Sequence, residues 1–360
     1  MNSRGEANAL NGWRASSTRQ RGLPESGPAW ICFCWSRLLA FSLVSIPIAG
    51  FKDVYDVPAV EKALQELPPG ANEALRALYD KMLRVGGQRF TVKPSAMPAM
   101  DELCVELPNF GAVLEDIRKQ LALCMDSEDA VELPPMLLLG APGIGKTHFA
   151  RRIAQLLGTG YGFVPMSSLT AGWILSGASS QWKNAKPGKV FETFLNGEYA
   201  NPVMVVDEID KASAEGQYDP LGALYGLLEL DTAMRFVDEF AEVPIDASGA
   251  VWFATANDAA RIPEPILNRM HVYEIEAPDA EGAARIANSI YREIRGAHDW
   301  GKAFPEAPAQ GVVERLAELS PREMRRAVLA AFGNAKLAGR GELCPEDVQD
   351  ARGARKRIGF

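Results

Sequence analysis

Cysteine and histidine are scarce in this sequence, and their scarcity limits the kinds of site that it can form. The 360 residues include five cysteines and three histidines. The one close pair, Cys32 and Cys34, has no further cysteine or histidine near it, so it does not match the spacing of a metal-binding knuckle. The odd number and scattered positions of the cysteines predict a protein of a reducing compartment, the cytoplasm.

An excess of positive charge is absent as well. The chain has a net charge of −8 at pH 7, whereas a general nucleic-acid surface needs clustered lysines and arginines. Its 47% hydrophobic and 23% charged residues are ordinary for a soluble globular protein, and its length allows two domains. We therefore do not expect nucleic acid as a partner.

The first fifty residues differ in composition from the rest of the chain. They carry five arginines and two glutamates, a net charge of +3, and residues 29–51 are mostly apolar. This pattern is compatible with an upstream extension that does not fold, with a membrane anchor whose arginines stay on the cytoplasmic side, or with a structured domain. We expect residues 1–52 to be an unfolded extension and keep membrane attachment through residues 29–51 as the alternative.

Beyond this extension, strand and helix patterns alternate. Apolar residues at helical spacing predict two helices between residues 57 and 85, broken at residues 68–70, so that residues 53–104 form a short helical segment. Apolar runs predict five strands, at residues 136–139, 161–166, 202–206, 250–256 and 272–275. The unbroken run at 202–206 is typical of a central parallel strand that is buried on both faces.

The carboxyl-terminal part of the sequence shows helical patterns alone. They are centred on residues 280–296, 309–319, 321–337 and 345–352. We therefore predict an α/β fold, with a parallel sheet flanked by helices over residues 105–278. A small all-α lid domain is expected over residues 279–360.

A glycine-rich sequence follows the first strand. Residues 140–147 have the GxxxxGKT pattern of a phosphate-binding loop, in which Lys146 contacts the β- and γ-phosphates and the Thr147 hydroxyl binds Mg²⁺. Glycines let backbone N–H groups turn toward phosphate oxygens, and the helix expected over residues 148–157 adds its positive amino end. The predicted nucleotide-binding residues are Gly140, Ala141, Pro142, Gly143, Ile144, Gly145, Lys146, Thr147 and His148.

Two acidic residues follow the apolar run at 202–206. A carboxylate at the end of a buried strand is costly unless a cation or a water molecule interacts with it. With a phosphate-binding loop in the same sheet, Asp207 is expected to hold Mg²⁺ together with Thr147. Glu208 is then the expected carboxylate that polarises the attacking water.

These motifs together resemble those of AAA+ ATPases, which implies that the α/β region has the P-loop NTPase fold. The segment Trp252–Asn257 is similar to the sensor 1 strand of that family, which implies that Asn257 contacts the γ-phosphate or the attacking water. Residues 262–270 are similar to the segment that carries the arginine finger in Lon-type proteases. This implies that Arg269 reaches the nucleotide of a neighbouring subunit, where such a residue contributes about 10³ to 10⁵ in rate.

The resemblance extends into the expected lid and into a loop before the acidic pair, and it covers about residues 105–352. Residues 320–326 look like a sensor 2 motif, which implies that Arg322 lies over the phosphates and that the two arginines after it face solvent or a partner. Trp182 and Lys183 stand where the family has an aromatic–aliphatic pair that grips a threaded polypeptide. The lysine departs from that pattern and puts the usual substrate preference in doubt.

The resemblance implies an ATP-binding and ATP-hydrolysing subunit of a ring-shaped homo-oligomer, expected to be a hexamer, which uses Mg²⁺ and remodels or unfolds a protein substrate. A Ser–Lys peptidase site and the long N-terminal substrate domain of Lon-type proteases have no counterpart in the sequence, so peptidase activity is not expected. Two alternatives remain. One is a nucleic-acid-linked ATPase of the clamp-loader or transposition-helper type, favoured by the basic tail at residues 352–357. The other is a non-catalytic, ATP-dependent scaffold.

Overall fold

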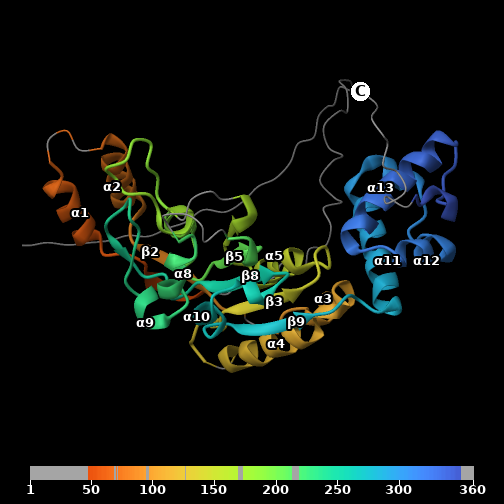
Figure 1. Ribbon diagram of the computed structural model, residues 1–360, viewed down its shortest axis with the longest axis horizontal. Coiled ribbons are helices and arrows are strands. Elements are labelled where there is room, and N and C mark those ends of the chain that lie inside the picture. The colour runs from red at the N-terminus through yellow and green to blue at the C-terminus, as the bar shows by residue number, and fades with distance from the viewer. Residues whose placement is uncertain are drawn as a thin grey trace, which may run out of the picture. The chain divides into compact units, whose positions relative to one another are not determined.

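The five predicted strands form one parallel sheet. The computed structural model describes residues 48–349, apart from residues 69, 71, 95–96, 126, 169–172 and 213–218, so the expected extension through residue 47 and the basic tail lie outside it. The strands are arranged in the order β4-β5-β8-β3-β9 (Figure 1). Their bounds are β3 Met136–Gly140, β4 Tyr161–Pro165, β5 Val203–Asp207, β8 Val251–Ala256 and β9 His271–Ile275. The predicted α/β sheet is therefore confirmed.

Both faces of this sheet are covered by helices. In β5, Val203 and Val205 pack in a core that also contains residues of α4 (Gly111–Met125) and α5 (Lys146–Leu157). Met204 and Val206 alternate with them along the strand and pack in a second core. This alternation explains why a strand covered on both sides is an unbroken apolar run in the sequence.

Short and medium helices complete the two faces. Besides α4 and α5, the helices of this region are α1 Val57–Glu66, α2 Glu73–Val85, α3 Met100–Glu106, α6 Trp173–Ser176, α7 Lys189–Asn196, α8 Gly222–Leu227, α9 Leu230–Ala233 and α10 Glu264–Leu267. Those that contribute buried side chains to the second core include α1, α2, α7, α8 and α10.

An antiparallel pair of strands was not anticipated. Strand β1 (Ile48–Asp53) pairs with β2 (Gln88–Val92), so the boundary expected at residue 52 falls inside a strand, and residues 53–104 are not only helical. Strand β2 is also tied to the segment before β5, because the N–H of Ala200 donates to the Phe90 carbonyl at 2.7 Å. These pairings join distant parts of the chain, and helical spacing alone gives no sign of them.

Arg89 anchors this strand pair to the α/β region. Its side chain is buried and donates to carbonyl oxygens at the end of α7, those of Phe194 at 2.9 Å and Leu195 at 3.1 Å. It also donates to the Gly86 carbonyl at 2.8 Å, just after α2. One guanidinium thus satisfies several carbonyl groups that helix ends leave without partners.

The lid helices pack on one another around their own core. They are α11 Ala280–Ala297, α12 Gln310–Ala317 and α13 Pro321–Leu337, drawn in blue in Figure 1. The expected fourth helix at 345–352 is wrong for the part that the structure describes, which has a single 3₁₀ turn at Pro345–Asp347. The buried Asp347 carboxylate accepts hydrogen bonds from Arg340 at 2.6 Å and from the N–H of Cys344 at 2.8 Å. These bonds stabilise the turn conformation of this segment. None of the described helices is long and apolar enough to span a bilayer.

Candidate nucleotide-binding site

The loop between β3 and α5 adopts the geometry of a phosphate cradle. Gly143 and Gly145 have positive φ angles of 85° and 106°, which side chains disfavour. Lys146 begins α5, and its Nζ donates to the carbonyl oxygens of Gly140 at 2.6 Å and Ala141 at 2.9 Å. The loop therefore wraps around the ammonium group, while the amino end of α5 faces the space that a phosphate would occupy.

The ammonium group of Lys146 also reaches the neighbouring strand. Its Nζ donates to Oδ1 of Asn257, directly after β8, at 3.0 Å. Burial lowers the pKa of Lys146, and the nearby carboxylates of Asp210, Asp207 and Glu208 act in the opposite direction. A buried cation of this kind gains from a bound anion, so the site fits a polyphosphate.

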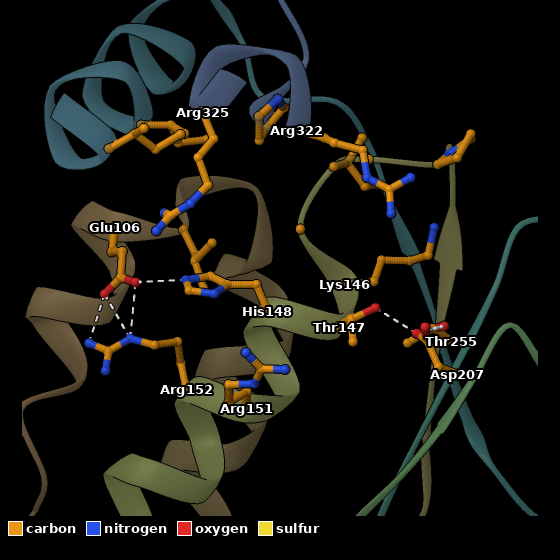
Figure 2. Close-up of a pocket in the computed structure, with 18 of the residues that line it drawn as sticks. Glu106, Lys146, Thr147, His148, Arg151, Arg152, Asp207, Thr255, Arg322 and Arg325 are labelled. Carbon is orange, nitrogen blue, oxygen red and sulfur yellow. Dashed lines mark hydrogen bonds and ion pairs between the residues drawn. The ribbon is translucent and has the colours of Figure 1, made fainter. Parts of the chain in front are cut away.

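Asp207, at the end of β5, links helix α5 and strand β8 through hydrogen bonds. Its Oδ1 accepts hydrogen bonds from the Thr147 hydroxyl at 2.5 Å and from the Thr255 hydroxyl at 2.8 Å (Figure 2). Thr147 lies on α5 and Thr255 on β8. A hydroxyl and a carboxylate oxygen side by side next to a phosphate cradle are ligands that suit Mg²⁺, so these residues fit the metal predicted for them.

Glu208 has a strained backbone. Its φ of 55° lies in the left-handed region, which a non-glycine residue adopts at a cost of about 1–3 kcal/mol. The N–H of Glu208 donates to the Thr255 hydroxyl at 2.9 Å, and this bond holds the turn. Glu208 lines the same cavity as Lys146, so the strained turn places this residue beside the phosphate loop.

The cavity extends from the phosphate loop to the lid. Its volume is about 780 Å³, within the usual range for small-molecule sites. Arg322 lines it from the first turn of α13, and a Cβ placed on Gly143 would lie 3.6 Å from the Arg322 Cβ. The hydroxyl of Ser320 and the carboxylate of Glu323 form a capping box that holds this turn. The lid thus presents a guanidinium to the phosphate loop.

A cluster of charged side chains in the cavity was not predicted from the sequence. Glu106, at the end of α3, lies 3.0 Å from Nε2 of His148 and accepts from the Arg152 guanidinium at 2.8–3.0 Å (Figure 2). Burial raises the pKa of Glu106, but the bonds from His148 and Arg152 outweigh it and hold that pKa below its ordinary value. The one available signal was the spacing of His148 and Arg152, which puts both on one face of α5.

The lid adds a second charged pair. Arg325 lines the cavity and makes two bonds to the Glu293 carboxylate, at 2.6 and 2.8 Å, while its side chain remains 54% exposed. This pairing lowers the pKa of Glu293 and raises that of Arg325. The next arginine, Arg326, is exposed, as expected.

Arg269 and the expected substrate loop lie outside this cavity. Arg269 follows α10, and its Nε is 2.8 Å from Oε1 of Glu229. Trp182 and Lys183 belong to the loop at residues 177–188, which the N–H of Ala178 closes by donating to the Lys186 carbonyl at 3.1 Å. The structure therefore brings together the phosphate loop, the acidic pair, Asn257 and Arg322, and it leaves the other three predicted residues on other surfaces.

A buried carboxylate anchors the loop at residues 177–188. Asp238 lies between the short strands β6 (Phe236–Val237) and β7 (Pro244–Ile245) and is fully buried. Its Oδ2 accepts from the N–H of Gly188 at 2.7 Å, and its Oδ1 accepts from the N–H of Phe240 at 2.9 Å and of Ala241 at 3.0 Å. Burial raises the pKa of Asp238 to about 6.

Comparison with known proteins identifies relatives of the central region. Residues 136–277 match the ATPase family associated with various cellular activities (AAA). A Lon protease of Roseiflexus castenholzii is 27% identical over 299 residues, which cover 79% of this chain and 37% of that protein. A Lon protease of Desulforamulus reducens is 30% identical over 240 residues, covering 64% of this chain and 29% of that protein. The chain thus spans about a third of the length of these relatives.

Solved structures show the same fold at low sequence identity. A closed-state reconstruction of Hsp104 with ATPγS and FITC-casein superposes with a TM-score of 0.51 at 15% identity. The match covers 66% of this chain and 47% of the Hsp104 chain. This likeness supports the arrangement of sheet and helices described above.

The raised pKa of Asp238 predicts a pH-dependent stability. Because its folded-state pKa of about 6 exceeds the ordinary value of 3.8, the protonated carboxyl contributes stability below about pH 4, and this contribution is lost as the pH rises through 6. The free energy of unfolding of the wild type should fall over this range by up to about 1.4 kcal/mol per pH unit, relative to Asp238→Asn. Urea unfolding at pH 4, 5, 6 and 7 measures this difference.

The exposed Asp231 supplies the control, since Asp231→Asn should keep the wild-type slope. Identical pH slopes for wild type and Asp238→Asn would contradict the assignment.

Proposed function

Residues 136–277 are an AAA ATPase domain similar to the ATPase module of Lon proteases, and on that premise we propose that the chain hydrolyses ATP as a subunit of a ring-shaped assembly that remodels polypeptides. One observation carries the hydrolytic part of this proposal. The phosphate loop, the acidic pair and Asn257 converge at one edge of the sheet, around the Lys146 ammonium group.

Each residue at this edge has a role that its position supports. Lys146 and the amino end of α5 bind the β- and γ-phosphates. Thr147 and Asp207 hold Mg²⁺, which when bound neutralises charge on the phosphates. Glu208 accepts a proton from the attacking water, and Asn257 orients that water or the γ-phosphate.

The lid and a second subunit complete the proposed site. Arg322 enters the cavity from α13 and places positive charge over the phosphates. Arg269 does not line its own cavity, which supports a role at the site of a neighbouring subunit. A guanidinium delivered across a subunit boundary stabilises the charge that develops on the transferred phosphoryl group. Turnover is therefore a property of the assembly.

The loop at residues 177–188 has features that favour a polypeptide as the substrate. Its Trp182 side chain is 42% exposed, and Asp238 holds the end of the loop. An exposed ring on an anchored loop can pack against side chains of many kinds. The adjacent Lys183 favours substrates that carry acidic side chains.

Loss of the proposed base should separate binding from turnover. Glu208→Gln removes the proton acceptor and should lower the ATPase rate by about 10²- to 10⁴-fold while ATP binding persists. Lys146→Ala should instead weaken ATP binding itself, because a charged contact to the phosphates is lost. Titration with a fluorescent ATP analogue and a phosphate-release assay measure the two properties.

Glu61→Gln, an exposed position on α1, controls for the loss of one charge. Wild-type turnover in Glu208→Gln would exclude Glu208 as the base.

Loss of the proposed arginine finger should be rescued by mixing. Arg269→Ala should bind ATP and hydrolyse it about 10³- to 10⁵-fold more slowly. In a mixture with Glu208→Gln subunits, some interfaces combine an intact Glu208 with an intact Arg269, so the rate should exceed that of either variant alone. Arg315→Ala, on the surface of the lid, is the control.

No gain on mixing, at concentrations where the subunits assemble, would argue against a role across the interface.

Stimulation of turnover should identify the substrate class. An unfolded acidic polypeptide should raise the ATPase rate severalfold, and double-stranded or single-stranded DNA should not, because the chain carries a net negative charge. Trp182→Ala should reduce this stimulation. Trp173→Ala, an equally exposed tryptophan on α6, should reduce it less.

Stimulation by DNA but not by polypeptide would favour the nucleic-acid-linked class instead. Tight ATP binding without turnover under any of these conditions would favour a scaffold.

A further inference from the structure

Arg269 is held by contacts on two sides of its guanidinium. Its Nη1 donates to the carbonyl oxygen of Pro265, a residue of α10, at 2.7 Å. Its Nε lies 2.8 Å from Oε1 of Glu229, a residue that comes from a different segment of the chain. In the described part of the chain, no hydrogen bond from Nη2 is found. The group is thus oriented along one edge and free at its outer nitrogen.

The backbone of Glu229 is fixed by the helix that it precedes. Glu229 is the N-cap residue of α9, and its carbonyl accepts from the N–H of Ala233 at 2.9 Å and from the Thr232 hydroxyl at 3.2 Å. The helix is short, but one main-chain and one side-chain hydrogen bond hold its amino end in place. The carboxylate of Glu229 consequently projects from a defined point beside α10.

The surface next to this ion pair is apolar and exposed. Leu230 follows Glu229 directly and is 51% exposed, and Met234 at the end of α9 is 45% exposed. Adjacent exposed apolar side chains of this size suit a surface that another protein covers. Covering them would also remove water from the Arg269–Glu229 pair, and this would strengthen the interaction.

We propose that Glu229 is a positioning residue that orients the Arg269 guanidinium for its action at the nucleotide of a neighbouring copy of this chain. The proposal rests on the function proposed above for Arg269. An arginine side chain has many rotamers, and holding it before assembly removes an entropic cost from the step in which it meets the phosphate. The Glu229 carboxylate lies against Nε as an ion pair without a hydrogen bond, and the Pro265 carbonyl accepts from Nη1. The outer nitrogen is left to contact the phosphoryl oxygens.

A double-mutant comparison tests whether Glu229 acts through Arg269. Glu229→Ala should lower kcat of the assembled protein about 10- to 100-fold with little change in the nucleotide KM, because the Glu229 side chain does not line its own cavity. Glu229→Asp, which retains the carboxylate charge that pairs with Arg269, should recover part of this loss. In the Arg269→Ala background, Glu229→Ala should cause no further loss.

Asp231→Asn is the matched control. It removes a carboxylate from the same helix, and Asp231 makes no ion pair with the residues that the structure describes. It should keep the wild-type rate.

Mixing separates a positioning role from a merely structural one. A Glu229→Ala subunit keeps its own base, whereas a Glu208→Gln subunit keeps a well-oriented Arg269. A mixture of the two should therefore hydrolyse ATP faster than either variant alone. A structural defect confined to the Glu229→Ala subunit would not be rescued by its neighbour.

The outcomes distinguish this inference from the proposed function. If Arg269→Ala turns over at the wild-type rate, the role of Arg269 itself fails. If Arg269→Ala is slow but Glu229→Ala matches the wild type, only the positioning role fails. If Glu229→Ala hydrolyses ATP faster than the wild type, the positioning role also fails, because Glu229 would then restrain Arg269.

Discussion

One carboxylate oxygen ties the candidate site together. Oδ1 of Asp207 accepts hydroxyl hydrogen bonds from Thr147 on α5 and from Thr255 on β8. The three side chains come from segments far apart in the sequence, and the bonds require β5 and β8 to be neighbours with β3 next in the sheet. The strand order is therefore a condition for the site, because it sets the spacing between the phosphate loop and the acidic pair.

Buried charge and backbone strain are concentrated at this edge of the sheet. The Lys146 ammonium group is buried among carbonyl groups and Asn257, while Glu208 adopts a left-handed backbone conformation. Such features cost stability and persist where the surrounding structure holds them in place. Here the sheet edge and the hydroxyl of Thr255 provide that support. A bound polyphosphate would relieve part of the cost by pairing with the ammonium group.

On the proposed function, two features outside the cavity serve an activity that is shared between subunits. Arg269 is oriented by Glu229 on one surface, and the loop that carries Trp182 is anchored by Asp238 on another. Neither reaches the nucleotide cavity of its own chain. On the proposed function, Arg269 acts at the nucleotide site of a neighbouring subunit and Trp182 contacts a polypeptide. A single chain therefore holds one nucleotide-binding site and contributes to two further sites.

The amino-acid sequence by itself determined the features that depend on neighbours along the chain. The apolar run before Asp207 predicted a buried central strand, and the glycine spacing before Lys146 predicted the phosphate loop, because local sterics and burial on both faces restrict which residues can occur there. Only the tertiary structure decided the pairing of β1 with β2, the bonds from His148 and Arg152 to Glu106, and the contact of Arg269 with Glu229. These interactions join residues that are distant in sequence. Their partners are selected by the packing of the whole domain, which no local pattern records.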